Sequence, residues 1–362
     1  MNKYALATAI SLTYATMSWS SAPAVAQDNA ELSPAEKIYA ELATLSPEER
    51  EKRIIEGAEK EGSLVFVHTW RGELARDHVD IFQKRYPFLN VEFIDIGSQD
   101  AAERLSAEEA AGRHLTDAMS VSIGDTDHIR SLLAHYTTPA LDKILPEYEG
   151  LKDPESLWVP FYFTEHGLSY NSSLLTPEQA PKDWWDLCKP EYKGMISFDP
   201  PELRFLLGMN EVIGSDRIEE WIKCIGANDP ITQRGHTQRL QLMLAGDHAI
   251  QGDNYLYLGM SMKAENPDLP FQPVWTAPVH GAGGALLINK NTPHPYAAAL
   301  LADWMLSEES QQYTSDKYRG PITMPNPYMP ADAKVVVVGN GDPENNNRLL
   351  DMWEQYVSRG GQ

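Results

Sequence analysis

Arginine, aromatic, hydroxyl and carboxylate side chains follow several predicted strands of this sequence. In open α/β sheets, ligands bind beyond the carboxyl ends of the strands. The strands predicted at 64–67, 118–122, 195–198 and 249–251, and a helix start near 236, lead into loops that carry such groups. We therefore predict a site for a small organic anion, carboxylate or phosphate, formed by Thr69, Trp70, Arg71, Gly124, Asp125, Asp199, Arg204, His236, Thr237, Asp253, Asn254 and Tyr255.

Each part of such an anion has a candidate partner in these loops. Gly72, Asp125 and Asn254 lie near predicted helix starts, where free backbone N–H groups and the helix dipole suit an anionic oxygen. Arg71 or Arg204 would add a bidentate clamp.

Trp70 and Tyr255 are predicted to sandwich an apolar or planar ligand body. Purely structural roles remain open for many of the candidates. They are helix capping for Thr69, Asp125 and Thr237, surface exposure for Arg71, packing for Trp70, a turn for Asp199 and a helix start for His236.

Catalytic signatures are missing from the sequence. It holds no G-x-S-x-G elbow, no H-E-x-x-H helix and no Cys/His metal spacing. We therefore predict a binding protein without enzymatic activity or cofactor, with an exported hydrolase as the alternative from another class. The formal net charge of −22 argues against nucleic acid and anionic membrane surfaces as partners.

The N-terminus has the pattern of a secretory signal peptide over residues 1–26. A basic start at Lys3 precedes a mostly apolar stretch from Tyr4 to Trp19, and Ala24-Val-Ala26 fits a cleavage site before Gln27. We expect a soluble, monomeric, periplasmic protein. In that oxidising compartment Cys188 and Cys224 are expected to form a disulfide, with two buried free thiols as the alternative.

The order of predicted elements indicates an α/β protein with two lobes. Short apolar strands alternate with amphipathic helices in two series, which predicts a mixed, mostly parallel sheet flanked by helices in each lobe. The β-like segment 158–171 is expected to cross between the lobes. The predicted parts are a helical lead-in at 27–61, lobe 1 at 62–164 and 277–312, lobe 2 at 165–276, and a C-terminal loop and closing helix at 313–362.

The segment 280–312 resembles the return segment of bacterial extracellular solute-binding proteins. It reads as a glycine-rich loop and strand, then His294-Pro295, an Ala-rich helix and Leu306-Ser-Glu-Glu309. Further blocks agree in order and spacing: Glu61-Gly-Ser-Leu-Val-Phe-Val67, Phe82-Gln-Lys-Arg-Tyr-Pro87, Glu109-Ala-Ala-Gly-Arg-His114, Ala180-Pro-Lys-Asp-Trp184, Glu191-Tyr-Lys-Gly-Met-Ile196 and Arg234-Gly-His-Thr237.

Together these blocks are similar to the ferric-iron-type branch of the substrate-binding proteins of ABC importers. The resemblance implies a Venus-flytrap fold that holds a small molecule between its lobes. It also implies an inner-membrane permease as partner, driven by a cytoplasmic ATPase.

Ferric iron is the alternative cargo that this resemblance raises. Ferric-binding relatives use adjacent tyrosines, whereas the matching place here reads Asp253-Asn-Tyr-Leu-Tyr257, with Leu256 at the second tyrosine position. Tyr257 would point about 100° further round a helix. An iron site would therefore have to use Tyr255, Tyr257 and Asp253.

Overall fold

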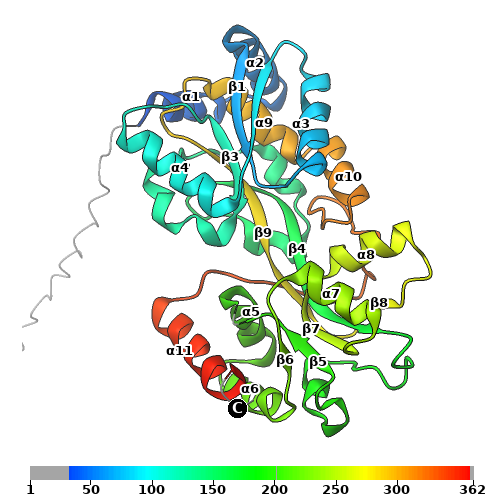
Figure 1. Ribbon diagram of the computed structural model, residues 1–362. Helices are drawn as coiled ribbons and strands as arrows, with labels where there is room; N and C mark the ends of the chain where they lie inside the picture. The colour runs from blue at the N-terminus through cyan, green and yellow to red at the C-terminus, as the bar shows by residue number, and fades with distance from the viewer. Residues whose placement is uncertain (1–31, 201, 359–362) are drawn as a thin grey trace, which may run out of the picture. The chain divides into compact units, whose positions relative to one another are not determined.

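The computed structural model describes residues 32–200 and 202–358 (Figure 1). The predicted signal peptide at 1–26 lies outside these residues. Within the described ranges, no helix has the length and apolar character needed to cross a membrane.

Two capped helices open the described chain. They are α1 (Pro34–Leu42) and α2 (Pro47–Glu61), and each starts with a serine N-cap, a proline in the first turn and a reciprocal glutamate bond. Gly62 ends α2 with a left-handed φ of 64°, a conformation that glycine adopts without steric cost. These helices lie within the segment 27–61.

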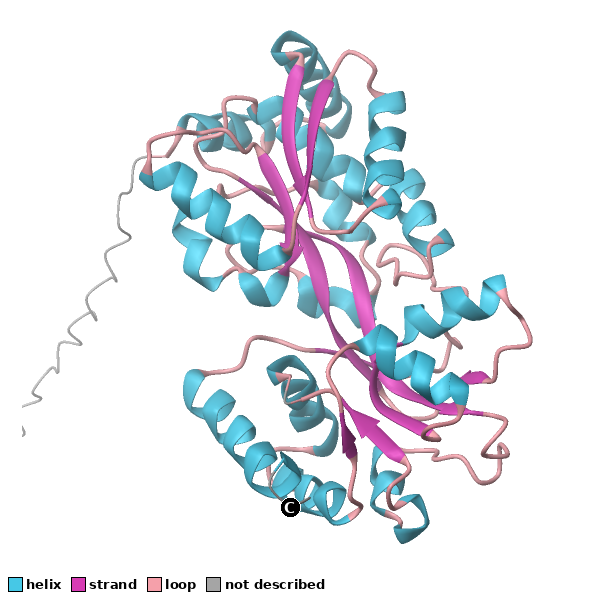
Figure 2. Cartoon of the chain, in the orientation of Figure 1, coloured by secondary structure: helices cyan, strands magenta, loops and turns pink. Residues whose placement is uncertain are grey.

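A single ten-stranded mixed sheet runs through the structure, with helices on its faces (Figure 2). At one end, β1 (Ser63–His68) lies between β2 (Asn90–Asp95) and β3 (Ala118–Ser122), parallel to both. At the other end, β5 (Ile196–Phe198) lies parallel to β6 (Ile231–Thr232) and β7 (Ile250–Tyr255). The expected α/β class with mostly parallel strands at each end is confirmed.

Two long strands, β4 (Val159–Asn171) and β9 (Val279–Ile288), connect these ends. They pair antiparallel from Val159 opposite Leu286 to His166 opposite His280, and Figure 1 shows them side by side. Strand β9 also pairs with β3, and β4 also pairs with β7. The short strands β8 (Phe271–Pro273) and β10 (Val335–Val337) add to β4 and β9.

The remaining helices follow the alternation of strands. They are α3 (Glu73–Arg85), α4 (Ser98–Ala110), α5 (Leu203–Ile213), α6 (Ile218–Ala227), α7 (His236–Ala245), α8 (Leu256–Glu265), α9 (Pro295–Met305), α10 (Glu308–Asp316) and α11 (Pro343–Trp353). The closing helix α11 continues as one π-helical turn at Glu354–Ser358.

The buried apolar side chains form separate clusters. One cluster joins the first helices, β1 and α9, and includes Phe66 and Leu301. Another joins β5, α5, α6 and α11, and includes Phe198, Trp221 and Trp353. Cys188 and Cys224 border this second cluster and are bonded to each other, with their Cα atoms 5.3 Å apart.

Two local expectations differ from the structure. The helix expected from Asp125 to His135 is replaced by two short 3-10 helices, Ile123–Asp125 and Asp127–Leu132. The loop expected at 280–284 is already part of β9. Glycine is needed there because a Cβ on Gly281 would overlap the backbone of Thr164 on the paired strand β4.

Candidate ligand-binding site

Arg319 lies among three aromatic rings contributed by distant parts of the chain. Its guanidinium carbon is 5.0 Å from the ring centre of Trp70, 5.7 Å from that of Tyr162 and 4.4 Å from that of Tyr257. These distances are those of cation–π contacts. Trp70 follows β1, Tyr162 lies within β4, Tyr257 lies at the start of α8 and Arg319 follows α10. The fold, and not local sequence, therefore brings them together.

The Arg319 group contains two buried hydrogen-bond donors without a partner. They are Nε of Arg319 and Nε1 of Trp70. Burial raises the pKa of Tyr162, while the charge of Arg319 and the nearby Trp70 N–H oppose that rise. Among the described residues, no carboxylate lies within ion-pair distance of Arg319. The arrangement therefore offers an unneutralised cation beside an aromatic surface.

A second arginine, Arg204, lies in the first turn of α5 against Gly124. A Cβ on Gly124 would overlap the Arg204 guanidinium, so this close approach requires glycine. The charge of Arg204 acts on the phenols of both Tyr162 and Tyr255. The structure thus brings the predicted pair Arg204 and Gly124 together, near the Arg319 group.

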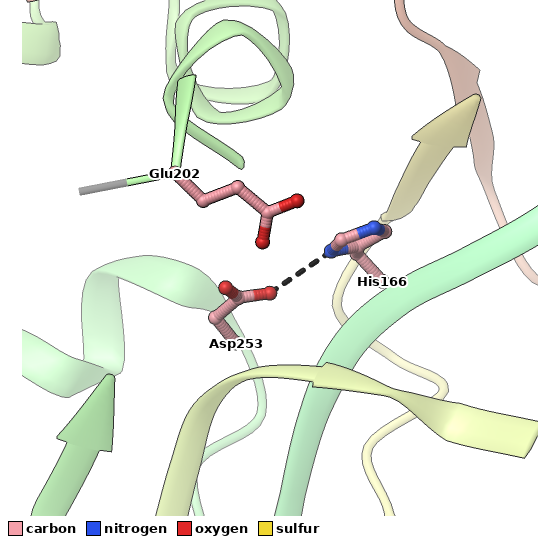
Figure 3. Close-up of side chains that lie close together, drawn as sticks. All are labelled: His166, Glu202 and Asp253. Atoms are coloured by element: carbon pink, nitrogen blue, oxygen red, sulfur yellow. Dashed lines mark hydrogen bonds and ion pairs between the residues drawn. The ribbon is translucent and has the colours of Figure 1, made fainter. Parts of the chain in front are cut away.

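A group of two carboxylates and one histidine lies next to Tyr255. It contains His166 of β4, Glu202 before α5 and Asp253 of β7, whose possible ligand atoms all lie within 4.8 Å of one another. Nδ1 of His166 is 2.9 Å from Oδ1 of Asp253. Figure 3 shows the carboxyl groups of Glu202 and Asp253 turned toward the same imidazole.

His236 and Arg239 of α7 support this group. The fully buried Arg239 places Nη2 2.7 Å from the Asp253 carbonyl, 3.3 Å from Asp199 and 3.1 Å from Nδ1 of His236. Because arginine only donates, Nδ1 of His236 accepts and its Nε2–H faces Oε2 of Glu202 at 3.3 Å. Three of the predicted residues, Asp199, His236 and Asp253, therefore belong to one hydrogen-bonded network.

Charges in this network favour ionised carboxylates. Burial raises the pKa of Asp253, but the hydrogen bond and charge of His166, with the charges of His236 and Arg239, outweigh it and lower that pKa to about 2. Burial raises the pKa of Glu202, but the hydrogen bond from His236 and the charges of His166 and His236 together outweigh it and lower that pKa. Burial lowers the pKa of His236, but the bond to Glu202 and the charges of Asp253 and Glu202 together raise it.

Tyr255 links the two groups. Its ring lies 4.5 Å from His166, 4.1 Å from His236 and 5.9 Å from Tyr257, with which it stacks. Because Tyr255 is the N-cap of α8, the two tyrosines share one side of the chain instead of diverging. The expected placement of a ligand between Trp70 and Tyr255 stays a prediction. Among the described residues these two rings make no contact with each other, and Trp70 and Tyr257 both lie next to the Arg319 guanidinium.

The other predicted residues lie apart from these groups or contribute differently. Arg71 is exposed and pairs with Asp95 at 3.2 Å. Thr69 donates its backbone N–H to Ser120. Thr237 is exposed in the first turn of α7, whose N-cap is Gly235, so the predicted cap at Thr237 is wrong. Asn254 is fully buried within β7, and both of its amide atoms lack a partner.

Sequence reasoning missed Arg319, His166, Glu202 and Arg239. Arg319 follows α10 in a loop that carries no strand signal, and His166 lies inside a strand rather than after one. Glu202 stands two residues before Arg204, close enough in sequence to have been included with it as a candidate. Arg239 is three residues after His236, and that helical spacing was the one available signal for it.

A separate cavity of about 820 Å³ is lined by residues of α2, α3, α9 and α10. It contains none of the predicted site residues. Its most buried charge, Arg50, is bonded to Asp303 and to the hydroxyl of Tyr136, 2.5 Å away. Among the described residues that line this cavity, none has a buried side-chain polar atom without a hydrogen-bond partner.

Comparison with known families identifies the class of protein. Residues 118–345 match the model of a bacterial extracellular solute-binding protein family, and the chain belongs to that family. It is a solute-binding protein of the ABC-transporter type. Such proteins lie outside the cytoplasm, where they bind a small-molecule ligand and pass it to a membrane permease. They are not typically enzymes. No curated protein sequence matches the chain.

Solved structures confirm the fold of the ferric-type branch. Iron-bound HitA from Pseudomonas aeruginosa is 18% identical with a TM-score of 0.66, covering 81% of this chain and 99% of its own. Trichodesmium FutA, in complex with iron and citrate, is 17% identical at 0.68, with coverage of 82% and 99%. AfuA from Actinobacillus pleuropneumoniae, with fructose-6-phosphate bound, is 19% identical at 0.64, with coverage of 82% and 99%. These neighbours carry different ligands, so the fold alone does not define the cargo.

Proposed function

We propose that this protein captures a small organic anion, of carboxylate or phosphate type, and delivers it to an ABC permease. The observation that carries the proposal is Arg319, a half-buried cation without a carboxylate partner among the described residues. A buried donor that lacks an acceptor costs free energy, which a bound anion would recover. A guanidinium also matches the paired oxygens of carboxylates and phosphates.

The groups around Arg319 support an anion that has an organic body. Tyr257 and Trp70 offer ring surfaces next to the guanidinium. Arg204 adds a second positive charge from α5. In this proposal the anionic head binds Arg319 and Arg204, and the rings contact the rest of the ligand.

In this proposal, both lobes contribute contacts to the ligand. The residues of the Arg319 group come from lobe 1, from the crossing strand β4, from α8 and from the C-terminal segment. A ligand that contacts all of them favours a closed arrangement, because only that arrangement offers every contact at once. A permease would then distinguish loaded from empty protein by lobe closure.

Native mass spectrometry of protein purified from its periplasm, followed by acid release, tests the proposal. A co-purified organic acid or phosphate ester supports it and names the chemical class. Titration calorimetry with a panel of carboxylates and phosphate esters then gives affinities for wild type, R319A and R319K. We expect R319A to weaken binding about 30-fold or more, the loss of a charge-assisted hydrogen-bonded contact. R319K should recover part of the loss, because it restores the charge but not the planar fork.

Arg217 provides the matched control for these variants. It also stacks on an aromatic ring, with its guanidinium 4.1 Å from the centre of Trp185, but it pairs with Glu220 and is half exposed. R217A should leave anion affinity unchanged. Equal affinity of R319A and R217A for the co-purified anion would refute the assignment of Arg319.

Ferric iron is the second candidate cargo. The stacking of Tyr255 on Tyr257, close to Asp253, is the observation that favours it. An iron–tyrosinate complex absorbs visible light, whereas an organic anion does not. A coloured protein whose absorption disappears in Y255F would therefore replace the anion proposal with iron transport.

A further inference from the structure

We propose that His166, Glu202 and Asp253 bind a divalent transition metal of the zinc class. The proposed site lies next to the anion site and is independent of it. All three side chains come from β4, β7 and the segment before α5, and none comes from the Arg319 group. The anion proposal and the metal proposal can therefore fail separately.

The geometry of the three side chains suits a shared ion. One imidazole nitrogen and two carboxylate oxygens already lie within 4.8 Å of one another. Ligands on a zinc ion with bonds of about 2.1 Å lie roughly 3.0–3.5 Å apart, so the group must contract by about an ångström. Glu202 supplies that movement, because its side chain is 30% exposed while those of His166 and Asp253 are each 1% exposed.

An independent observation also points to a missing partner. Oδ2 of Asp253 is buried and has no hydrogen-bond partner among the described residues, and the Asp253 side chain is 1% exposed. A buried ionised oxygen without a partner is costly. The hydrogen bond from His166 to the other oxygen, Oδ1, leaves that cost in place. A cation bound between Asp253 and Glu202 removes it.

Neighbouring residues hold the proposed ligands in orientation. Nε2 of His236 faces Glu202, and Nδ1 of His236 is fixed by Arg239. Arg239 also holds the backbone carbonyl of Asp253 at 2.7 Å. Such supporting contacts are a regular feature of protein metal sites, where they orient the ligands.

The donor set favours zinc over harder and softer ions. Imidazole combined with carboxylates is a common zinc environment, and three protein ligands leave a fourth position open for water or another ligand. Ferric iron prefers phenolate and carboxylate oxygens.

Titration of metal-free protein with Zn²⁺ tests the inference. Full-length mature protein is dialysed against chelator and titrated by calorimetry, and Co²⁺ is added in parallel because tetrahedral cobalt absorbs in the visible range. We expect one equivalent to bind. E202Q, D253N and H166Q should each weaken binding about 100-fold or more, and H236A about 10- to 100-fold through loss of orientation.

Two controls separate the possible results. E220Q removes an exposed carboxylate and should bind Zn²⁺ like wild type, since Glu220 pairs with Arg217 at the surface. R319A should lose anion affinity but keep Zn²⁺ affinity. Circular dichroism and thermal melting identify any variant that does not fold. Because the Glu202 side chain is 30% exposed, E202Q should disturb folding least among the three ligand variants.

Three outcomes would overturn the inference. The first is unchanged Zn²⁺ affinity in folded E202Q and H166Q. The second is the absence of Zn²⁺ and Co²⁺ binding to wild type at micromolar concentration. The third is selective Fe³⁺ binding with a visible band that disappears in Y255F, which would assign the same region to iron.

Discussion

Glu165 provides a test of the electrostatics of strand β4 through the pH dependence of stability. Its side chain is 3% exposed, and Oε1 accepts a hydrogen bond of 2.8 Å from Asn326. Burial raises its pKa from 4.5 to about 7, partly opposed by its hydrogen bonds and by the charge of Arg319. We predict that E165Q removes a pH dependence that the wild type shows between these two values.

The direction follows from proton binding in the two states. Between pH 4.5 and about 7, the folded protein keeps a proton on Glu165 that the unfolded chain has released. Wild-type stability relative to E165Q is therefore highest below pH 4.5 and is lost as the pH rises through 7. A rise of roughly 2.5 pKa units at about 1.4 kcal/mol each gives a difference of about 3 kcal/mol.

Urea denaturation of both proteins at intervals from pH 4.5 to 8.5 measures this difference. The amide of E165Q keeps an oxygen that accepts from Asn326, so packing is preserved. The free energy of unfolding of E165Q minus that of wild type should increase with pH and level off above about 7. Parallel pH profiles for the two proteins would refute the reasoning, because Glu165 would then be ionised in the folded state throughout.

Three further predictions concern packing and covalent structure. Arg239→Met should lower the free energy of unfolding by about 3–5 kcal/mol, because a buried network loses its donor, and chemical denaturation measures this. Arg217→Met at the surface should change it by less than about 0.5 kcal/mol. The double variant Cys188→Ala/Cys224→Ala should lose about 3–4 kcal/mol, since the bond spans 36 residues, and thermal melting should show a lower Tm. Gly124→Ala should displace the neighbouring guanidinium and weaken anion binding in calorimetry without a comparable loss of Tm.

The strand and helix alternation was predictable because its signals are local. Apolar runs such as 64–67 fall inside β1, and the capping motif at Ser33 starts α1 as expected. The helix expected from Asp125 was wrong, because the segment forms two short 3-10 helices instead. The glycine run at 280–284 reads as a loop in sequence, but pairing with β4 makes it a strand.

Site residues were predictable where they follow a strand and not where tertiary contacts bring them in. Arg204 was included among the candidates because it comes soon after β5, and the structure places its guanidinium against Gly124. Arg319 was missed because the residues around it in the sequence give no sign that it contacts the rings of Trp70 and Tyr257. Arg71 has the right position in sequence, but Asp95 pairs with it at the surface.

The pairing of β9 with both β3 and β4 has a consequence for how the chain assembles. The sheet between its two ends is complete only when residues 279–288 are in place, long after Asn171 has ended β4. Until then, β3 and β4 each present an unpaired edge, and closing the gap requires a contact between residues more than a hundred positions apart. Such non-local pairing slows folding. A nascent chain that stops short of β9 therefore stays incomplete and exposed, which favours chaperone binding over early collapse.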